Sequence, residues 1–255
     1  MERRYIDNMV SVITPVYNAE RFISEMIESV LKQTYKSLEI ILIDDCSSDS
    51  SAKIIQDYCK RYESIIYHLQ EKNMGAAVAR NRALELARGQ YVAFLDSDDI
   101  WKPEKLERQI KLAQKKNATF LYTAIEMIDE TGNVIKEKRN VEEQFNYKKL
   151  LKNTMLATST IIVDRKQLGD FRMPLQRSGQ DYATWLQLLR NGAIAYGINE
   201  ALVQYRVSRG SLSSNKFKSV KQVWQIQVNQ EKISPIRATY NTCWFIWNAL
   251  KKYVI

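Results

Sequence analysis

Tyr91-Val-Ala-Phe-Leu-Asp-Ser-Asp-Asp-Ile-Trp101 is the stretch of the sequence that most constrains the fold. Its first five residues are mostly apolar, with aromatic and β-branched members, which predicts a short buried strand. Three carboxylates follow within four residues of the strand's end. Carboxylates crowded at one strand end repel each other, so we expect them to be solvated or neutralised by a cation.

The spacing of the acidic residues allows a metal site. Asp96 and Asp98 lie two residues apart, so both carboxylates can reach one hard divalent ion, Mg²⁺ or Mn²⁺. Water and phosphate oxygens would fill the remaining positions. The alternative is a solvated acidic turn that caps a helix beginning near Pro103. The rest of the chain favours the metal site.

The composition is that of an ordinary globular protein. With 255 residues and 45% hydrophobic content, the chain suits one large domain, or one domain with an appendage. No run of about 18 apolar residues predicts a membrane span, and the N-terminus has no secretory apolar region. We therefore expect a cytoplasmic location. The three cysteines lack Cys-x-x-Cys spacing, which argues against a disulfide framework or a zinc site.

The net charge of +9 is concentrated near the C-terminus. Residues 201–255 hold nine Lys or Arg residues against one acid, Glu231, so the first 200 residues are nearly neutral. No helix-turn-helix, zinc-finger or RNA-binding signature accompanies these basic residues, and we expect no nucleic-acid partner. An anionic membrane surface fits the charge better.

Strand and helix patterns alternate over the first 100 residues. Strands are predicted at 9–14, 38–43, 65–69 and 91–95, with helices at 19–32, from about 54 and up to 88 between them. This alternation predicts an α/β fold with a parallel sheet and helices on both faces. Ligands of such sheets bind beyond the carboxyl ends of the strands.

Unusual residues follow three of these strands. They are Pro15-Val-Tyr-Asn18, Asp44-Asp45 and Asp96-Ser-Asp98. The chain has neither a dinucleotide-binding glycine pattern nor a P-loop, so a metal ion and Arg or Lys side chains are expected to hold any phosphates.

Three side chains near this sheet edge suit a nucleotide. Tyr17 can stack on a base, Asp45 can accept the N3 hydrogen of uracil, and Arg80 can reach a diphosphate from the front of its helix. The structural alternatives are a packed tyrosine, a helix N-cap and a surface cation.

Four motifs resemble, in order and spacing, the family 2 inverting glycosyltransferases with the GT-A fold. They are Val10-Ser-Val-Ile-Thr-Pro-Val-Tyr-Asn-Ala-Glu20, Ile43-Asp-Asp-Cys-Ser-Ser-Asp49, Asn73-Met-Gly-Ala-Ala-Val-Ala-Arg-Asn-Arg-Ala83 and Phe94-Leu-Asp-Ser-Asp-Asp-Ile-Trp101. The resemblance continues through Ser178-Gly-Gln-Asp-Tyr-Ala-Thr-Trp-Leu186 and Tyr205–Ser214, and covers roughly residues 8–220. It looks closest to bacterial enzymes of teichuronic acid, capsule or O-antigen assembly.

The resemblance implies a domain organisation. A GT-A domain with a Rossmann-like mixed sheet flanked by helices is expected over residues 1–215, with 8–101 as the nucleotide-binding half and 102–215 as the acceptor half. Residues 216–255 are expected to form basic, aromatic C-terminal helices.

It also implies roles for individual residues. Pro15, Tyr17, Glu20 and Asp45 would surround the uridine of a UDP-sugar donor, and Arg80 would lie near the nucleotide. Asp96 would face the ribose and the metal, while Asp98 would bind the metal directly. Asp181 matches the catalytic base of the family.

Two positions depart from the family pattern. Gln180 stands where Glu is often found before the base, and Cys46 stands where glycine is common. The only histidine, His68, lies in a predicted strand and is expected to be structural, so the metal should lack a histidine ligand.

The implied mechanism is a direct displacement that inverts the anomeric carbon. A divalent cation would neutralise the leaving diphosphate, and Asp181 would take the proton of the attacking hydroxyl. The acceptor would be a glycan, free or linked to a polyprenyl lipid.

A loop after residue 205 is predicted to close over the donor. Arg206 and Arg209 flank small residues including Ser211, so we expect a flexible lid that folds over the diphosphate. An ordinary surface loop is the alternative.

The C-terminal segment has an aromatic face with basic neighbours. Apolar residues recur at helical spacing beside Arg237, Lys251 and Lys252; they are Ile236, Tyr240, Trp244, Trp247 and Leu250. The face either packs on its own domain or contacts the inner surface of the cell membrane.

Two other functions stay open at this point. A sugar nucleotidyltransferase is disfavoured because its glycine-rich, Arg-containing opening is missing after the first strand. The second is an inactive sugar-nucleotide-binding or membrane-associated protein.

Overall fold

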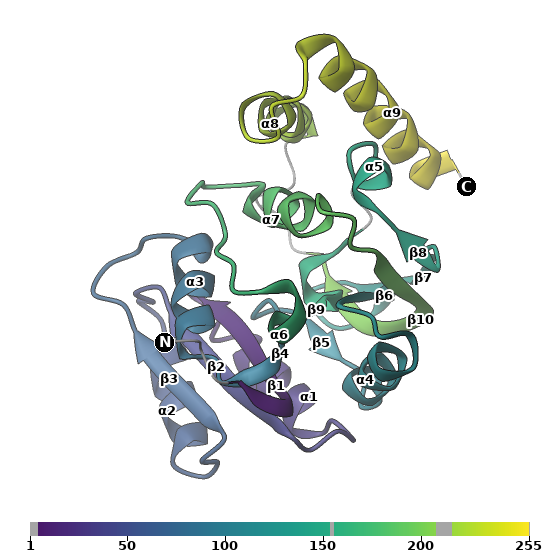
Figure 1. The fold of residues 1–255 in the computed structure, drawn as a ribbon. Helices are drawn as coiled ribbons and strands as arrows, with labels where there is room; N and C mark the ends of the chain where they lie inside the picture. The colour runs from purple at the N-terminus through teal and green to yellow at the C-terminus, as the bar shows by residue number, and fades with distance from the viewer. Residues whose placement is uncertain (1–4, 154–155, 208–215, 255) are drawn as a thin grey trace.

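The computed structural model describes residues 5–153, 156–207 and 216–254 (Figure 1). Its strands are β1 (Ile6–Val16), β2 (Leu38–Asp44), β3 (Ile65–Leu69), β4 (Gly89–Phe94), β5 (Ile100–Trp101), β6 (Phe120–Ile128), β7 (Val134–Arg139), β8 (Gln144–Phe145), β9 (Ile162–Asp164) and β10 (Ala195–Arg206). Its helices are α1 (Ile23–Leu31), α2 (Ser51–Cys59), α3 (Ala76–Leu86), α4 (Lys105–Lys116), α5 (Tyr147–Leu150), the 3-10 helix η1 (Thr158–Thr160), α6 (Arg165–Leu168), α7 (Gln180–Leu189), α8 (Lys216–Asn229) and α9 (Pro235–Val254).

These strands form one mixed sheet in the order β3-β2-β1-β4-β9-β6-β10-β5, with β7 paired to β6 and β8 to β10. The strands of the first 100 residues are parallel, as predicted, because a helix connects each to the next. Their carboxyl ends therefore meet at one edge. The GT-A architecture expected from the motifs is confirmed by this mixed sheet and its flanking helices.

The second half of the sheet differs from the pattern predicted for it. The apolar pattern of residues 156–163 predicts a strand, but η1 occupies the middle of this run and only Ile162–Asp164 is extended. The Thr160 hydroxyl donates to the Ala157 carbonyl at 2.6 Å and stabilises this turn locally. The short β9 that remains pairs antiparallel with both β4 and β6.

The first helix also begins later than predicted. The sequence pattern predicts a helix over 19–32, for which Asn18 is a suitable N-cap, yet α1 begins at Ile23. Asn18 has a left-handed backbone with φ of 48°, and its side-chain oxygen accepts from the Ser48 amide at 2.8 Å. Asn18 thus joins the loops after β1 and β2 instead of capping α1.

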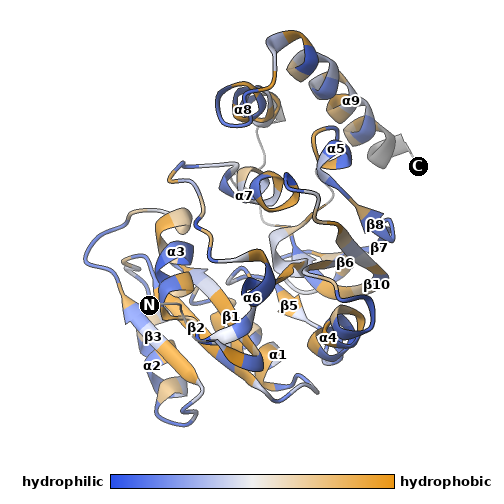
Figure 2. Ribbon diagram, viewed as in Figure 1, coloured by the Kyte–Doolittle hydropathy of each residue, from blue (hydrophilic) through white to orange (hydrophobic). Residues whose placement is uncertain are grey.

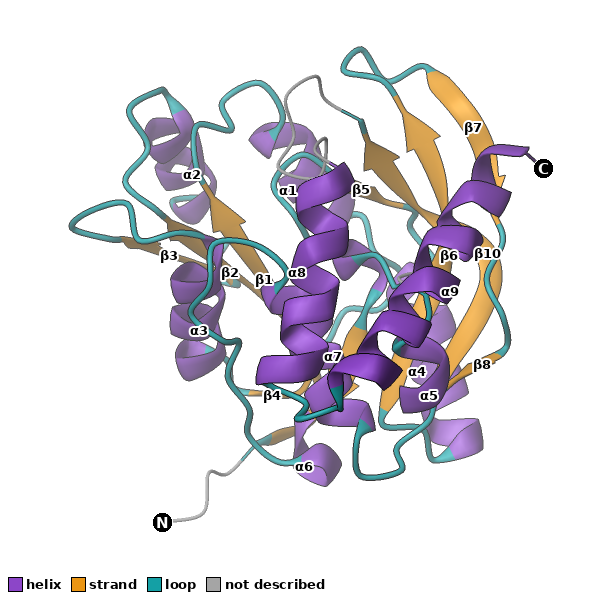
Figure 3. Cartoon of the chain, turned by 90° about the horizontal axis from the view of Figure 1, so that it is seen from above, coloured by secondary structure: helices purple, strands orange, loops and turns teal. Residues whose placement is uncertain are grey.

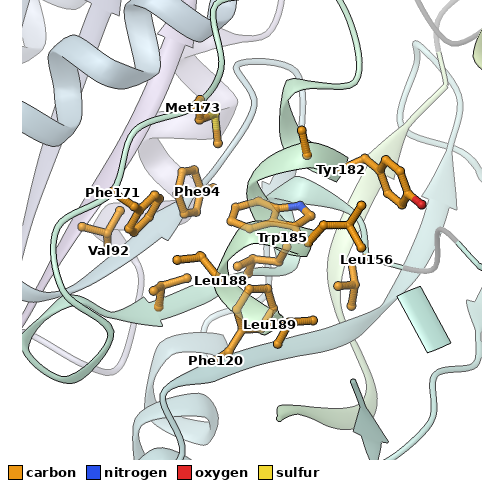
Figure 4. Packing of buried hydrophobic residues seen from close by; sticks show 14 of the residues in the cluster. Val92, Phe94, Phe120, Leu156, Phe171, Met173, Tyr182, Trp185, Leu188 and Leu189 are labelled. Atoms are coloured by element: carbon orange, nitrogen blue, oxygen red, sulfur yellow. The ribbon is translucent and has the colours of Figure 1, made fainter. Parts of the chain in front are cut away.

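Alternate residues of each central strand face opposite cores, as a period of two requires. Val10 and Val12 of β1 pack in the core that α1, α2 and α4 cover, whereas Ile13 faces the core beneath α3 and α7. Figure 2 shows the resulting hydrophobic strands between more polar helix surfaces. In the second core, Phe94 and Phe120 meet the ring of Trp185 edge-on, at 5.0 and 5.5 Å between centroids (Figure 4).

The last two helices lie on the side of α7 that faces away from the sheet (Figures 1 and 3). They pack against each other, and Asn241 of α9 donates a hydrogen bond to the side chain of Gln227 of α8 at 2.9 Å. The C-terminal helices predicted for residues 216–255 are therefore present, while the predicted boundary at residue 215 lies outside the described residues. Within the described residues, no helix is long and apolar enough to cross a membrane.

Candidate active site

A cavity of about 600 Å³ opens at the carboxyl edge of the parallel strands. Seven residues singled out from the sequence line it: Pro15, Tyr17, Asp45, Arg80, Asp96, Asp98 and Asp181. They come from five separated segments of the chain. These meet because β1, β2 and β4 end at the same edge, where α3 contributes Arg80 and α7 begins across from them. Two other predicted site residues, Glu20 and Arg206, are described by the structure but do not line the cavity. The predicted lid residues Arg209 and Ser211 lie outside the described residues.

The acidic turn after β4 has two partly buried carboxylates, Asp96 and Asp98, and one fully buried carboxylate, Asp99. Asp96 and Asp98 line the cavity, and burial together with the charge of Asp96 raises the pKa of Asp98 to about 6. Asp99 points into the protein, where it accepts from the Ser159 hydroxyl at 2.5 Å and the Arg206 amide at 2.8 Å. Burial, followed by the charges of Asp98 and Asp96, raises the pKa of Asp99 well above its usual value. Asp99 therefore anchors the turn, and the other two face the cavity.

A divalent cation fits this turn. No three side chains of His, Cys, Asp or Glu come together as a metal site among the described residues, so a cation here would also need substrate or water oxygens. Asp96 and Asp98 offer the hard oxygen ligands that Mg²⁺ and Mn²⁺ prefer. Burial and the neighbouring charge of Asp96 disfavour the charged form of Asp98 and raise its pKa, and a bound cation would offset both effects.

Arg80 is a buried part of the cavity wall and not a surface cation. Its side chain is about nine-tenths buried, and its guanidinium donates to Oδ1 of Asp96. The ion pair fixes the orientation of Asp96 beside Asp98. Arg80 also supplies positive charge at the place where the acidic turn meets the cavity.

Asp45 organises the loop that precedes α3. Its Oδ1 accepts from Gln70 Nε2 at 2.6 Å and from the Met74 amide at 2.7 Å, and its Oδ2 accepts from the Gly75 amide at 2.7 Å. A carboxylate has about four acceptor positions, so Oδ2 keeps one for a ligand. The next residue, Cys46, has φ of 65°, a left-handed conformation that explains why glycine is common there in the family.

Tyr17 is an exposed member of the set of residues that the sequence predicted to surround the nucleotide. It is 54% exposed and lines the cavity next to Pro15 and Asp45. The alternative of a packed tyrosine therefore does not hold. Glu20, in contrast, lies in the loop before α1, and its carboxylate accepts from the Ser50 amide at 2.9 Å, next to the start of α2. Glu20 therefore joins these two segments and lies outside the cavity wall.

Arg206 differs most from its predicted place on a mobile lid. It ends β10 and is 4% exposed. Its guanidinium donates to the Asp98 carbonyl at 2.8 Å, to the carbonyl of Asp129 at 3.1 Å and to the Glu25 carboxylate at 2.6 Å. The buried guanidinium of Arg206 therefore supports the acidic turn from behind, and Arg206 is not part of a mobile lid.

Asp181 lies in the first turn of α7, across the cavity from the acidic turn. Gly179, with φ of 71°, allows the sharp entry into this helix. The Thr158 hydroxyl contacts Oδ2 of Asp181 at 3.4 Å, a long hydrogen bond that leaves the carboxylate available on the cavity side. Nearby, Gln180 Oε1 and Trp185 Nε1 are buried without a hydrogen-bond partner in the described part of the chain. Both residues line the cavity, so they suit a hydroxyl-bearing ligand.

Sequence reasoning missed the contribution of α8 and of the segment before α7. Arg177, Tyr182, Lys218 and Gln222 all line the cavity. Gln222 is fixed by the Ser178 hydroxyl, which donates to its side-chain oxygen at 2.7 Å. In the sequence, only the motif at 178–186 pointed to this part of the cavity. No local pattern in α8 indicates that this helix lines a cavity.

The fold is that of a GT-A glycosyltransferase, and the family model for glycosyl transferase family 2 matches residues 11–173. The chain therefore belongs to glycosyl transferase family 2. It is 43% identical over 244 residues to TuaG of Bacillus subtilis (strain 168), named provisionally as a teichuronic acid biosynthesis glycosyltransferase, covering 96% of this chain and 97% of that one.

A second relative is WfgD of Escherichia coli. Its name is UDP-Glc:alpha-D-GlcNAc-diphosphoundecaprenol beta-1,3-glucosyltransferase, and it is 39% identical over 249 residues, covering 97% of this chain and 96% of its own.

Solved structures agree on the fold. The crystal structure of S. aureus TarS 1-349 in complex with UDP-GlcNAc matches with a TM-score of 0.72 and 20% identity, over 93% of this chain and 71% of that one. Mannosyltransferase PcManGT from Pyrobaculum calidifontis, in complex with GDP-Man and Mn²⁺, matches with a TM-score of 0.69 and 17% identity, over 88% of this chain and 64% of that one. At these identities the likeness extends to the fold alone.

Proposed function

We propose that this glycosyltransferase moves a sugar from a UDP-sugar donor to a lipid-linked glycan acceptor in cell-surface polysaccharide synthesis, with inversion at the anomeric carbon. The observation that carries the proposal is one cavity lined both by the Asp96–Asp98 turn and by Asp181. Direct displacement needs charge stabilisation on the leaving side and a proton acceptor on the attacking side. The two carboxylate sites, on different elements, can meet these two needs.

The donor would bind along the strand ends. Tyr17 would stack on the uracil ring, and the remaining acceptor position of Asp45 Oδ2 would take the N3 hydrogen. Arg80, with Asp96, would lie beside the ribose and diphosphate. The UDP-Glc in the name of WfgD and the UDP-GlcNAc in the TarS complex support UDP as the nucleotide.

Asp98 would hold Mg²⁺ or Mn²⁺ directly, with Asp96 assisting. When bound, the cation would offset the negative charge that develops on the departing diphosphate. The Mn²⁺ in the PcManGT complex supports a divalent ion in this fold. The residues behind Asp98, above all Asp99 and Arg206, keep the turn in the position that such a ligand needs.

Asp181 would act as the general base. Its carboxylate faces the cavity from the first turn of α7 and would accept the proton of the acceptor hydroxyl during attack. Because the hydroxyl approaches from the side opposite the diphosphate, one displacement inverts the configuration. The Thr158 contact orients the carboxylate for this role.

The acceptor would occupy the α7–α8 end of the cavity. Apolar side chains there include Val223 and Phe245, and two cationic residues, Arg177 and Lys218, line the same cavity. This mixture suits a diphosphate carried on a polyprenyl lipid, the acceptor class named for WfgD. Transfer would then occur in the cytoplasm, at the inner face of the cell membrane.

A panel of UDP-sugars tests the function. With Mn²⁺ and a synthetic polyprenyl-diphosphate sugar acceptor, we expect one donor to give acceptor-dependent release of UDP and a product of inverted anomeric configuration by NMR. Release of pyrophosphate from UTP and a sugar phosphate would instead identify a nucleotidyltransferase. If UDP-sugars bind by calorimetry but no donor is consumed, the chain is an inactive binding protein.

A further inference from the structure

Helix α9 carries a face of exposed apolar residues. Ile236 is 87% exposed, Trp247 53% and Trp244 41%. Tyr240, Ile246 and Leu250 are exposed as well. At 3.6 residues per turn, the positions 236, 240, 244, 247 and 250 fall along one side of the helix. A contiguous exposed face with two tryptophans is unusual for a surface that meets only water.

The opposite side of α9 is fixed to the protein. Asn241 donates to Gln227 of α8 at 2.9 Å, and Asn248 donates to the Lys152 carbonyl at 3.1 Å. Ala238 is fully buried, and Phe245 reaches the wall of the large cavity. The helix is therefore held in place by its inner side, and its apolar outer side is not an effect of a loosely attached end.

Three cations lie beside Tyr240 of this exposed face. Lys148, Lys152 and Arg237 line a small cavity of about 110 Å³ together with Leu151, Tyr240 and Asn241. The ammonium of Lys152 lies 5.0 Å from the centroid of the Tyr240 ring. No Asp or Glu occurs after Glu231 in the sequence, and Glu231 already accepts from Arg190 and Tyr147. The cavity thus combines positive charge with an aromatic side chain and lacks an acidic residue in its wall.

We propose that α9 docks on an anionic lipid bilayer. Its outer residues enter the boundary between headgroups and acyl chains, where tryptophan and tyrosine side chains are most stable. Lys148, Lys152 and Arg237 then meet lipid phosphates at the same depth. This inference does not depend on the identity of the donor or acceptor.

Charge complementarity selects the bilayer over a second copy of the chain. In a two-fold dimer the same patch meets itself, so the cations around α9 would face the same cations of the other copy. Such like-charge contacts oppose association. An anionic bilayer instead offers apolar volume for the tryptophans and opposite charge for the lysines and arginine.

Vesicle sedimentation with the full chain tests the proposal. We expect binding to vesicles of phosphatidylcholine with 30% phosphatidylglycerol to be at least about tenfold tighter than to phosphatidylcholine alone, and to weaken in 0.5 M salt. Trp244→Ser with Trp247→Ser should lower the affinity about tenfold or more. Lys148→Gln with Arg237→Gln should lower it by a similar factor, only for the anionic vesicles.

Matched substitutions elsewhere serve as controls. Ile135→Ser, at an exposed apolar position of β7, and Lys36→Gln with Lys53→Gln, at exposed lysines, should leave vesicle binding unchanged. All variants should melt within about 2 °C of the parent, which shows that they fold. Equal binding by the tryptophan variant, or no vesicle binding by the parent, would overturn the proposal. A parent dimer by light scattering that the tryptophan variant converts to monomer, without vesicle binding, would assign the face to a second copy instead.

Discussion

The hydroxyl of Ser159 donates a hydrogen bond to the carboxylate of Asp99, 60 residues earlier in the chain, and both side chains are buried. Through this contact η1 is joined to the acidic turn that follows β4. The Ser159 hydroxyl also accepts from the Asp96 amide at 3.1 Å. One side chain therefore sets the position of the whole turn relative to Thr158 and Asp181.

Replacing Ser159 with alanine should loosen the acidic turn. A buried carboxylate that loses a donor costs about 1–3 kcal/mol, so the free energy of unfolding should fall by that amount in urea titration. Donor turnover should fall as well, because Asp96 and Asp98 lose their support. Ser37→Ala, at an exposed position before β2, is the control. Unchanged stability of Ser159→Ala would show that the bond contributes nothing.

Asp98→Ala should abolish the metal dependence of donor binding. The remaining carboxylate of Asp96 is already paired with Arg80 and cannot by itself hold a hard cation beside the diphosphate. Calorimetry of UDP with and without Mn²⁺ measures this effect. Asp57→Ala, which removes an exposed acid of α2, should keep the response to Mn²⁺. A normal response in Asp98→Ala would remove Asp98 as a metal ligand.

Asp181→Asn should separate binding from transfer. The amide keeps the shape of the side chain but cannot take a proton, so transfer should fall by roughly 10² to 10⁴ while UDP affinity stays within about twofold. Single-turnover assays and calorimetry on the same preparation give both values. Near-normal transfer would mean that another group is the base.

Lys105 should make stability depend on pH. Its side chain is fully buried, with Nζ 3.8 Å from the centroid of Trp101 and 2.8 Å from Gln109 Oε1, and burial lowers its pKa well below 10.5. Between the two pKa values the unfolded chain holds a proton that the folded chain has lost. Stability therefore rises with pH in this window, by at most about 1.4 kcal/mol per unit.

Lys105→Met should remove that slope. At high pH the variant should be less stable than the parent because Gln109 loses its donor, and towards neutral pH this deficit should shrink or reverse. Urea titrations between pH 7 and 10 measure the difference. Lys111→Met, at an exposed position of the same helix, should shift stability equally at each pH. Parallel curves for Lys105→Met and the parent would contradict the lowered pKa.

The sequence predicted those parts of the site whose positions follow from local strand and helix patterns. The predicted strands end just before Pro15, Asp44 and Asp96, so the three strand ends and their shared edge follow from the parallel sheet alone. The roles of Glu20 and Arg206 could not be read in this way, because each depends on a partner loop far along the chain.

The strand pairings in the second half of the sheet could not be predicted from the sequence either. The strand β10 has 12 residues and changes register twice against β6, between Ile198 and Val203, yet the chain stays extended through both shifts. Likewise the extent of β9 is decided by its contacts with β4 and β6, and not by its own apolar run.

The position of β9 determines how this protein can be divided. It pairs with β4 through Tyr91, Val92 and Ala93, so the presumed nucleotide-binding half has an edge that only the other half covers. A recombinant fragment ending at Trp101 would expose that edge and leave Phe94 without Trp185. We therefore expect such fragments to aggregate, and chimaeras to succeed only when exchanges keep residues 89–164 from one parent.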